Sequence, residues 1–209
     1  MRNEKPKIVI IEDHPVMREG LAAWFTATGR WQVAGTASGL AEAKKLLAAT
    51  QADIALLDIQ LEDGWGLDII PWLLSKAPDA KLSNPKNRPL MAVYSSFDDY
   101  AHVSASLSLG VRAYITKYRS EEELEEALLK ALAGETCIDE KVQAKLQSAV
   151  HMLNLLTKRE TEIFTLVKNG LSNKQIAARL GISRRTVENI LSCIYDKTGI
   201  RSRREPERL

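Results

Sequence analysis

The chain has 209 residues, 45% of them hydrophobic, enough to bury the cores of two modest domains or of one large domain. Its net charge of +2 hides an uneven distribution: residues 155–209 carry 12 Lys and Arg against 6 Asp and Glu, and the preceding residues carry 17 against 21. No apolar stretch approaches the length of a membrane span, no secretory signal is visible, and the two cysteines show no metal-ligand spacing. We therefore expect a cytoplasmic protein without a membrane partner, whose basic tail meets a polyanion.

Strand and helix patterns alternate through the first part of the chain. Apolar β-type runs predict five strands, at residues 7–11, 31–37, 54–59, 90–94 and 112–116. Helical patterns follow them at residues 16–28, 40–49, 66–75, 100–109 and 120–133, the last opened by a capping box of Ser120 and Glu123. Five such units predict a doubly wound α/β fold around a parallel sheet. Residues 78–89 contain three prolines and are predicted to form a surface loop.

Only helices are predicted after residue 155, at residues 158–169, 172–180 and 183–197, with a short stretch from Ser202. The sequence thus divides into a first domain of residues 1–133, a linker of residues 134–154 that is helical at 141–153, and an all-α domain of residues 155–209. Gly181 supplies the left-handed residue that ends one helix before the next begins. Two helices joined by so short a turn are typical of a helix-turn-helix, whose second helix enters the DNA major groove.

The third of these helices carries an apolar stripe at Val187, Ile190, Leu191 and Ile194. Counting about 100° per residue from this stripe gives the outward face, and the helix start adds groups suited to bases and phosphates. The residues expected to contact DNA are Lys174, Ser183, Arg184, Arg185, Thr186, Glu188, Asn189 and Ser192.

Carboxylates end two of the predicted strands. Glu12 and Asp13 follow the first strand, and Asp58 closes the third. Because ligands of such sheets bind outside the carboxyl ends of the strands, these groups would meet and repel one another unless a cation lay among them. Mg2+ prefers oxygen ligands, so we predict a Mg2+ site in which Asp58 is a nucleophile toward a phosphoryl group. Ser95 and Lys117, at the ends of the fourth and fifth strands, would meet the phosphate oxygens.

With residues 110–117, this set resembles the receiver domain of response regulators over roughly residues 7–133. The resemblance implies a flavodoxin-like, five-stranded fold. It implies that the acidic pair, the acceptor aspartate and the backbone carbonyl of Gln60 bind Mg2+, and that a sensor histidine kinase supplies the phosphate. It also implies that Ser95 and Tyr114 rearrange when the aspartate is phosphorylated.

The helical domain resembles the LuxR-type DNA-binding domain of the NarL/FixJ response regulators. The matching segments are residues 156–160, 169–177, 180–183, 186–188 and 199–203. By family position, Glu188, Asn189 and Ser192 would contact the groove. Family members often carry lysine and histidine where this chain has Glu188 and Ile190, so the recognised DNA sequence is expected to differ.

The sequence therefore predicts a transcription regulator rather than an enzyme, which forms a homodimer on phosphorylation and binds double-stranded promoter DNA. One alternative is a phosphatase of the haloacid-dehalogenase type, which needs a second aspartate where this chain has Gln60. Another is a receiver, dependent on phosphorylation or not, whose output is a protein partner. Only about two helical turns fit after Ser202, so dimerisation is not expected to rest on this end.

Overall fold

A computed structural model describes residues 4–75 and 88–198 of the chain. Most of the loop predicted at residues 78–89 and the helical stretch predicted from Ser202 lie outside the described residues. The chain folds as two compact units, which divide near residue 140.

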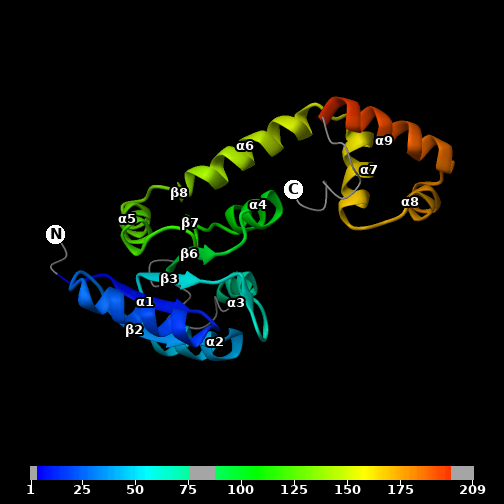
Figure 1. Cartoon of the computed structure of the whole chain (residues 1–209). Coiled ribbons are helices and arrows are strands. Elements are labelled where there is room, and N and C mark those ends of the chain that lie inside the picture. The colour runs from blue at the N-terminus through cyan, green and yellow to red at the C-terminus, as the bar shows by residue number, and fades with distance from the viewer. Residues whose placement is uncertain (1–3, 76–87, 199–209) are drawn as a thin grey trace. The chain divides into compact units, whose positions relative to one another are not determined.

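The first unit is built on a parallel sheet with the strand order β2-β1-β3-β6-β7-β8 (Figure 1). Its strands are β1 (Lys7–Ile11), β2 (Gln32–Ala37), β3 (Ile54–Leu57), β6 (Leu90–Ser95), β7 (Ala113–Thr116) and β8 (Cys137–Ile138). The predicted doubly wound α/β fold is confirmed, but the prediction of five strands was wrong, because β8 adds a sixth. This strand has only two residues, too few for a periodic signal, and it lies in the segment that we expected to be a linker.

Helices cover both faces of this sheet (Figure 1). They are α1 (Pro15–Ala27), α2 (Leu40–Ala49), α3 (Ile69–Ser75), α4 (Tyr100–Ser108) and α5 (Glu121–Leu132). Side chains alternate between the faces along each strand. Ile8 and Ile10 pack into one core with Phe25 of α1 and Leu128 of α5, whereas the intervening Val9 is equally buried on the other face. Burial on both faces explains why these strands read as continuous apolar runs in the sequence.

The predicted elements begin and end within two residues of the observed ones, with one difference at the third helix. There the chain first forms a 3-10 turn (Gly66–Asp68), and the α-helix starts at Ile69. Pro71 lies in the first turn of this helix, where a missing backbone N–H is tolerated. A hairpin of β4 (Gln60–Leu61) and β5 (Gly64–Trp65) was not predicted, since each strand has two residues.

The second unit contains α6 (Glu140–Asn154), which begins at the boundary, then α7 (Lys158–Lys168), α8 (Asn173–Leu180) and α9 (Arg184–Thr198). Its core joins the last three helices through Phe164, Ile176, Val187 and other apolar side chains. Capping boxes begin α7 and α8. No helix within the described residues has both the length and the apolar character needed to cross a membrane.

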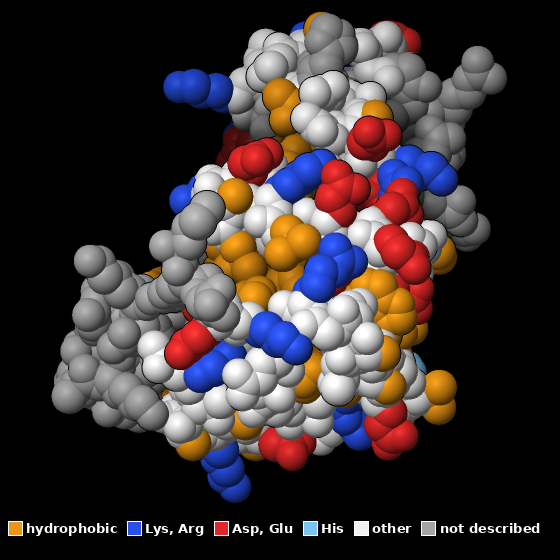
Figure 2. Space-filling model, turned by 90° about the vertical axis from the view of Figure 1, so that its left-hand side faces the viewer, with side chains coloured by type: hydrophobic (Ala, Val, Ile, Leu, Met, Phe, Trp, Pro, Cys, Tyr) orange, Lys and Arg blue, Asp and Glu red, His pale blue; other side chains and the backbone are white. Residues whose placement is uncertain are grey.

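Charged side chains of both signs are interspersed on the face of the molecule shown in Figure 2, with apolar side chains gathered between them. Large apolar side chains that are substantially exposed include Val16, Trp65 and Tyr118 in the first unit. Scattered exposure of this kind is normal, and the described residues on this face carry charges of both signs.

Candidate functional site

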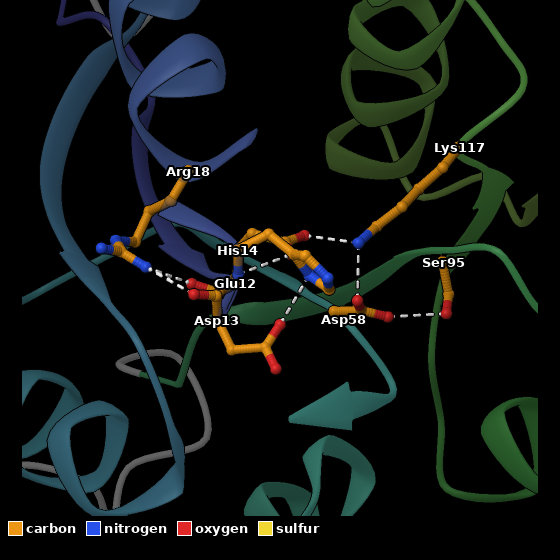
Figure 3. A network of polar contacts seen from close by, with 7 residues as sticks. All are labelled: Glu12, Asp13, His14, Arg18, Asp58, Ser95 and Lys117. Carbon is orange, nitrogen blue, oxygen red and sulfur yellow. Dashed lines mark hydrogen bonds and ion pairs between the residues drawn. The ribbon is translucent and has the colours of Figure 1, made fainter. Parts of the chain in front are cut away.

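The candidate site lies at the carboxyl ends of the strands, beside the point where the strand order reverses at β1 and β3. The backbone N–H of Asp58 donates to the carbonyl of Ile11, and that of Lys117 donates to the carbonyl of Ser95, each at 2.9 Å. These bonds hold the ends of neighbouring strands level. The side chains that follow β1, β3 and β7, and the last side chain of β6, therefore converge as predicted (Figure 3).

Asp58 is buried, and each of its carboxylate oxygens accepts one short hydrogen bond. The hydroxyl of Ser95 donates to Oδ1 at 2.6 Å, and the ammonium of Lys117 donates to Oδ2 at 2.6 Å. The same ammonium lies 2.7 Å from Oε2 of Glu12. Burial alone would lower the pKa of Lys117, but hydrogen bonds to Asp58 and Glu12 outweigh it and raise the pKa above its usual value. Lys117 is therefore a firmly charged group shared between two acids.

Three carboxylates converge here with an imidazole: ligand atoms of Glu12, Asp13, His14 and Asp58 all lie within 4.8 Å of one another. Oδ1 of Asp13 is buried and, among the residues that the structure describes, accepts no well-oriented hydrogen bond, although Nδ1 of His14 is 2.9 Å away. A buried carboxylate oxygen left in this state is costly, and a cation beside it would compensate. The oxygen-rich donor set fits Mg2+. Gln60, whose backbone carbonyl we expected to be a ligand, lines the same pocket.

Two side chains brace the acidic pair. The ring of His14 is 72% exposed and lies 3.0 Å from Oε1 of Glu12, and this hydrogen bond, with the nearby charge of Asp13, raises the pKa of the histidine. The guanidinium of Arg18 donates to the backbone carbonyls of Glu12 and Asp13 at 2.8 and 3.1 Å (Figure 3). Arg18 was not predicted, although an arginine in the first turn of α1, just after the acidic pair, was a usable signal.

A pocket of about 440 Å³ opens over these groups. Its lining residues are Asp13, His14, Asp58, Gln60, Leu61, Glu62, Ser95, Ser96, Phe97 and Lys117. Behind it, the fully buried Tyr114 donates its hydroxyl to the backbone carbonyl of Phe97 at 2.8 Å. The ring of Phe97 stacks on His102, with centroids 4.3 Å apart, and Trp65 lies 5.3 Å from His102. This aromatic cluster, which was not predicted, connects the hairpin after Asp58 with α4.

Gly66 allows the chain to pass close to the acceptor residue. A Cβ at this position would lie 1.9 Å from the carbonyl oxygen of Asp58. The N–H of Gly66 also donates to the carbonyl of Ile59 at 2.7 Å, which fixes the approach. No side chain can be accommodated here unless the backbone of Asp58 moves.

The second unit presents the predicted DNA-contacting residues at its surface. Gly181, with φ of 65°, ends α8, and the hydroxyl of Ser183 accepts from the N–H of Thr186 at 3.0 Å to begin α9. Arg184 and Glu188 form an ion pair at 2.9 Å on this face. All eight predicted residues are exposed: Lys174, Ser183, Arg184, Arg185, Thr186, Glu188, Asn189 and Ser192.

An acidic pocket at the carboxyl edge of a doubly wound sheet, followed by a helix-turn-helix, defines a DNA-binding regulator controlled through a receiver. Comparison with protein families agrees: the response regulator receiver domain matches residues 8–129, and the luxR family of bacterial regulatory proteins matches residues 154–207. The chain belongs to the response regulators that carry a LuxR-type DNA-binding domain, and this family is regulatory. The predicted fold and class of protein are confirmed.

Relatives share this organisation over nearly the whole chain. The DNA-binding transcriptional activator DevR/DosR of Mycobacterium tuberculosis (strain ATCC 25618 / H37Rv) is 33% identical, over 94% of this chain and 90% of the relative. The transcriptional regulatory protein LiaR of Bacillus subtilis (strain 168) is 30% identical, over 94% and 92%. RcsB from Salmonella enterica serovar Typhimurium, solved bound to the promoter P1flhDC, is similar in fold, with a TM-score of 0.70, 20% identity, and coverage of 95% of this chain and 94% of that chain.

Proposed function

We propose that Asp58 accepts a phosphoryl group from a sensor histidine kinase or a small phosphodonor. The observation that carries this proposal is the buried Asp58 carboxylate, which holds the hydroxyl of Ser95 and the ammonium of Lys117 on separate oxygens at 2.6 Å. Glu12, Asp13, Asp58 and the backbone carbonyl of Gln60 would hold Mg2+. When bound, Mg2+ offsets the charge of the incoming phosphate, which is the main demand of phosphoryl transfer.

Each residue then has a defined task. An oxygen of Asp58 bonds to phosphorus as the bond from phosphorus to the donor atom breaks. The ammonium of Lys117 sits on a flexible four-carbon stem and can follow the negative charge onto the phosphate. The hydroxyl of Ser95 can rotate from Asp58 to a phosphate oxygen, because a hydroxyl donates in whichever direction its proton turns. If the Ser95 side chain also rotates toward the phosphate, it would leave room in which the buried Tyr114 can shift, and this shift would carry the signal outward.

The output is binding of α9 in the major groove of promoter DNA. Asn189 and Ser192 lie on the exposed face that would read base edges, while Lys174 and the start of α9 at Ser183 would contact phosphates. Two phosphorylated chains bind a roughly palindromic site as a homodimer. Pairing doubles the phosphate contacts, and therefore raises both affinity and its dependence on salt.

The acceptor is tested by the intact mass of the full chain after incubation with acetyl phosphate, with and without Mg2+. We expect a phosphoryl adduct that requires Mg2+, is lost in Asp58→Asn and persists in Asp68→Asn, a matched change at an exposed carboxylate of the same unit. An adduct that survives in Asp58→Asn would place the phosphate elsewhere. If acetyl phosphate gives no adduct, beryllofluoride binding to wild type decides whether the site recognises a phosphoryl group at all.

The output is tested with DNA sites selected from a random library by the phosphorylated chain. Asn189→Ala should relax the base preference, and Lys174→Ala should weaken binding to all sequences and reduce the salt slope by about 1. Lys45→Ala, an exposed charge of the receiver unit, is the control and should change neither. Absence of salt-dependent DNA binding by wild type in both phosphorylation states would favour a protein partner as the output.

A further inference from the structure

A second buried acid of the first unit, Asp139, lies outside the pocket but is bonded to the segment that carries Lys117. Asp139 is 5% exposed and stands between β8 and α6. Its Oδ2 accepts from the hydroxyl of Thr116 at 2.8 Å and from Nε of Arg119 at 2.7 Å, and its Oδ1 accepts from Nη2 of Arg119 at 3.0 Å. Asp139 thus binds Thr116, directly before Lys117, and Arg119, two residues after it.

The backbone strengthens this attachment. The N–H of Asp139 donates to the carbonyl of Tyr114 at 2.9 Å, which places the acid at the end of the β7–β8 pair. Arg119 also donates to Glu123 at 2.9 Å, and Glu123 belongs to the capping box that begins α5. The chain on both sides of Lys117 is therefore tied to β8 and to the start of α5.

A gain in folding stability does not by itself explain the buried ion pair of Asp139 and Arg119. A buried ion pair loses much of its attraction to the cost of removing both charges from water, and an apolar replacement is often equally stable. Geometry offers a stronger reason. The reach of the Lys117 ammonium depends on where its backbone is held, and displacements of about 1 Å at a reacting centre have large effects.

We propose that Asp139 is a positioning residue for Lys117: by binding Thr116 and Arg119, it fixes the backbone that aims the ammonium at Asp58. This inference rests on the proposed role of Asp58 as phosphoacceptor. Without the carboxylate, the hydroxyl of Thr116 and the guanidinium of Arg119 would lose their shared acceptor, and the segment between them would no longer have one preferred position.

The same unit provides a matched control in Glu125. This acid is 2% exposed, accepts from Nε1 of Trp31 at 2.8 Å and pairs with Arg30. Like Asp139, it is a buried carboxylate bonded to an arginine, but Arg30 and Trp31 both lie just before β2, away from the segment around Lys117. Glu125→Ala therefore removes a comparable ion pair without changing the attachment of that segment.

The test is the affinity of the full chain for beryllofluoride with Mg2+, a mimic of the bound phosphoryl group, measured by isothermal titration. Asp139→Ala, which removes both oxygens, should weaken this affinity by about tenfold, the usual effect of removing an outer partner of a site residue, and should shift the NMR signals of Lys117. Glu125→Ala should leave both unchanged even where thermal denaturation shows an equal loss of stability. Equal affinity in Asp139→Ala and wild type, or equal loss in the two variants, would overturn the proposal.

Thr116 gives a second route should Asp139→Ala fail to fold. Thr116→Val removes one hydrogen bond to Asp139 and should weaken beryllofluoride binding by less than Asp139→Ala does, whereas Thr116→Ser keeps the hydroxyl and should have wild-type affinity. Failure of serine to restore it would contradict a positioning role. Wild type that binds no beryllofluoride would instead refute the proposed phosphoacceptor site itself.

Discussion

Gly66→Ala tests whether the acceptor loop is held by close backbone contact. The new Cβ would lie 1.9 Å from the carbonyl oxygen of Asp58, 3.1 Å from its carbonyl carbon and 2.9 Å from Cδ1 of Leu57. Since non-bonded heavy atoms normally stay about 3.5 Å apart, the two backbones must separate by more than about 1 Å. A backbone carbonyl cannot turn aside as a flexible side chain can.

The expected cost has two parts. Overpacking of this kind destabilises by roughly 1–3 kcal/mol, so the first unit should unfold at lower urea concentration. Displacement of Asp58 also lengthens its 2.6 Å hydrogen bonds to Ser95 and Lys117, and an increase of about 1 Å takes both beyond hydrogen-bonding distance. We therefore expect Gly66→Ala to lose most of the adduct formed from acetyl phosphate, as well as stability.

Gly20 is the control for this substitution. It lies within α1, where a Cβ would meet no atom within 4 Å, so Gly20→Ala should stabilise by about 0.4–1 kcal/mol and leave the adduct unchanged. Urea unfolding followed by tryptophan fluorescence and intact mass measure the two effects. Gly66→Ala with wild-type stability and a normal adduct would refute the argument that residue 66 must approach Asp58 without a side chain.

Two further predictions concern the helical unit. Glu188→Lys removes the ion pair with Arg184 and adds a cation on the exposed face of α9. The slope of log affinity for DNA against log salt concentration should therefore steepen by about 0.9 for each new phosphate contact. Glu162→Lys, the same change on α7, is the control, and equal slopes in the two variants would place position 188 away from DNA. The hydrogen bond from Lys197 lowers the pKa of Glu160 from 4.5 to about 2, so this carboxylate contributes stability above pH 4.5 that is lost as the pH falls to about 2. Glu160→Gln should abolish that part of the pH dependence, and a carboxyl NMR titration with a midpoint near 4.5 in wild type would contradict it.

Much of the fold could be predicted from the sequence because the apolar patterns and the capping residues indicated the same helices and strands. Runs such as that of β1 are buried on both faces, and the capping box of Ser120 and Glu123 appears as predicted. The failures are short elements. Strands β4, β5 and β8 have two residues each, and they exist because neighbouring chain segments pair with them, not because their own sequences favour strands.

The site could be predicted because side chains at the carboxyl ends of neighbouring parallel strands lie close together. Glu12, Asp58, Ser95 and Lys117 each follow or end a strand, and parallel pairing brings them together. The sequence did not predict the hydrogen-bond partners that hold these residues in position. The contact of Asp139 with Thr116 depends on a tertiary pairing across 23 positions of the chain, and neither residue type marks it in advance.

The shared ammonium of Lys117 links the charge of the pocket to the rest of the unit. It lies 2.7 Å from Glu12 and 2.6 Å from Asp58, so a divalent cation held by the same acids would compete with it for their oxygens. On the proposed mechanism, that competition would weaken the hold of Glu12 and Asp58 on the ammonium, and a phosphoryl group on Asp58 would give the ammonium a new and stronger partner. Because Thr116, directly before Lys117, is hydrogen-bonded to Asp139, and Asp139 to Tyr114, we expect a displacement of Lys117 to be passed to β7 and β8. Strand β8 leads through Asp139 directly into α6, so on the proposed mechanism this chain of bonds connects the phosphoacceptor with the start of the second unit.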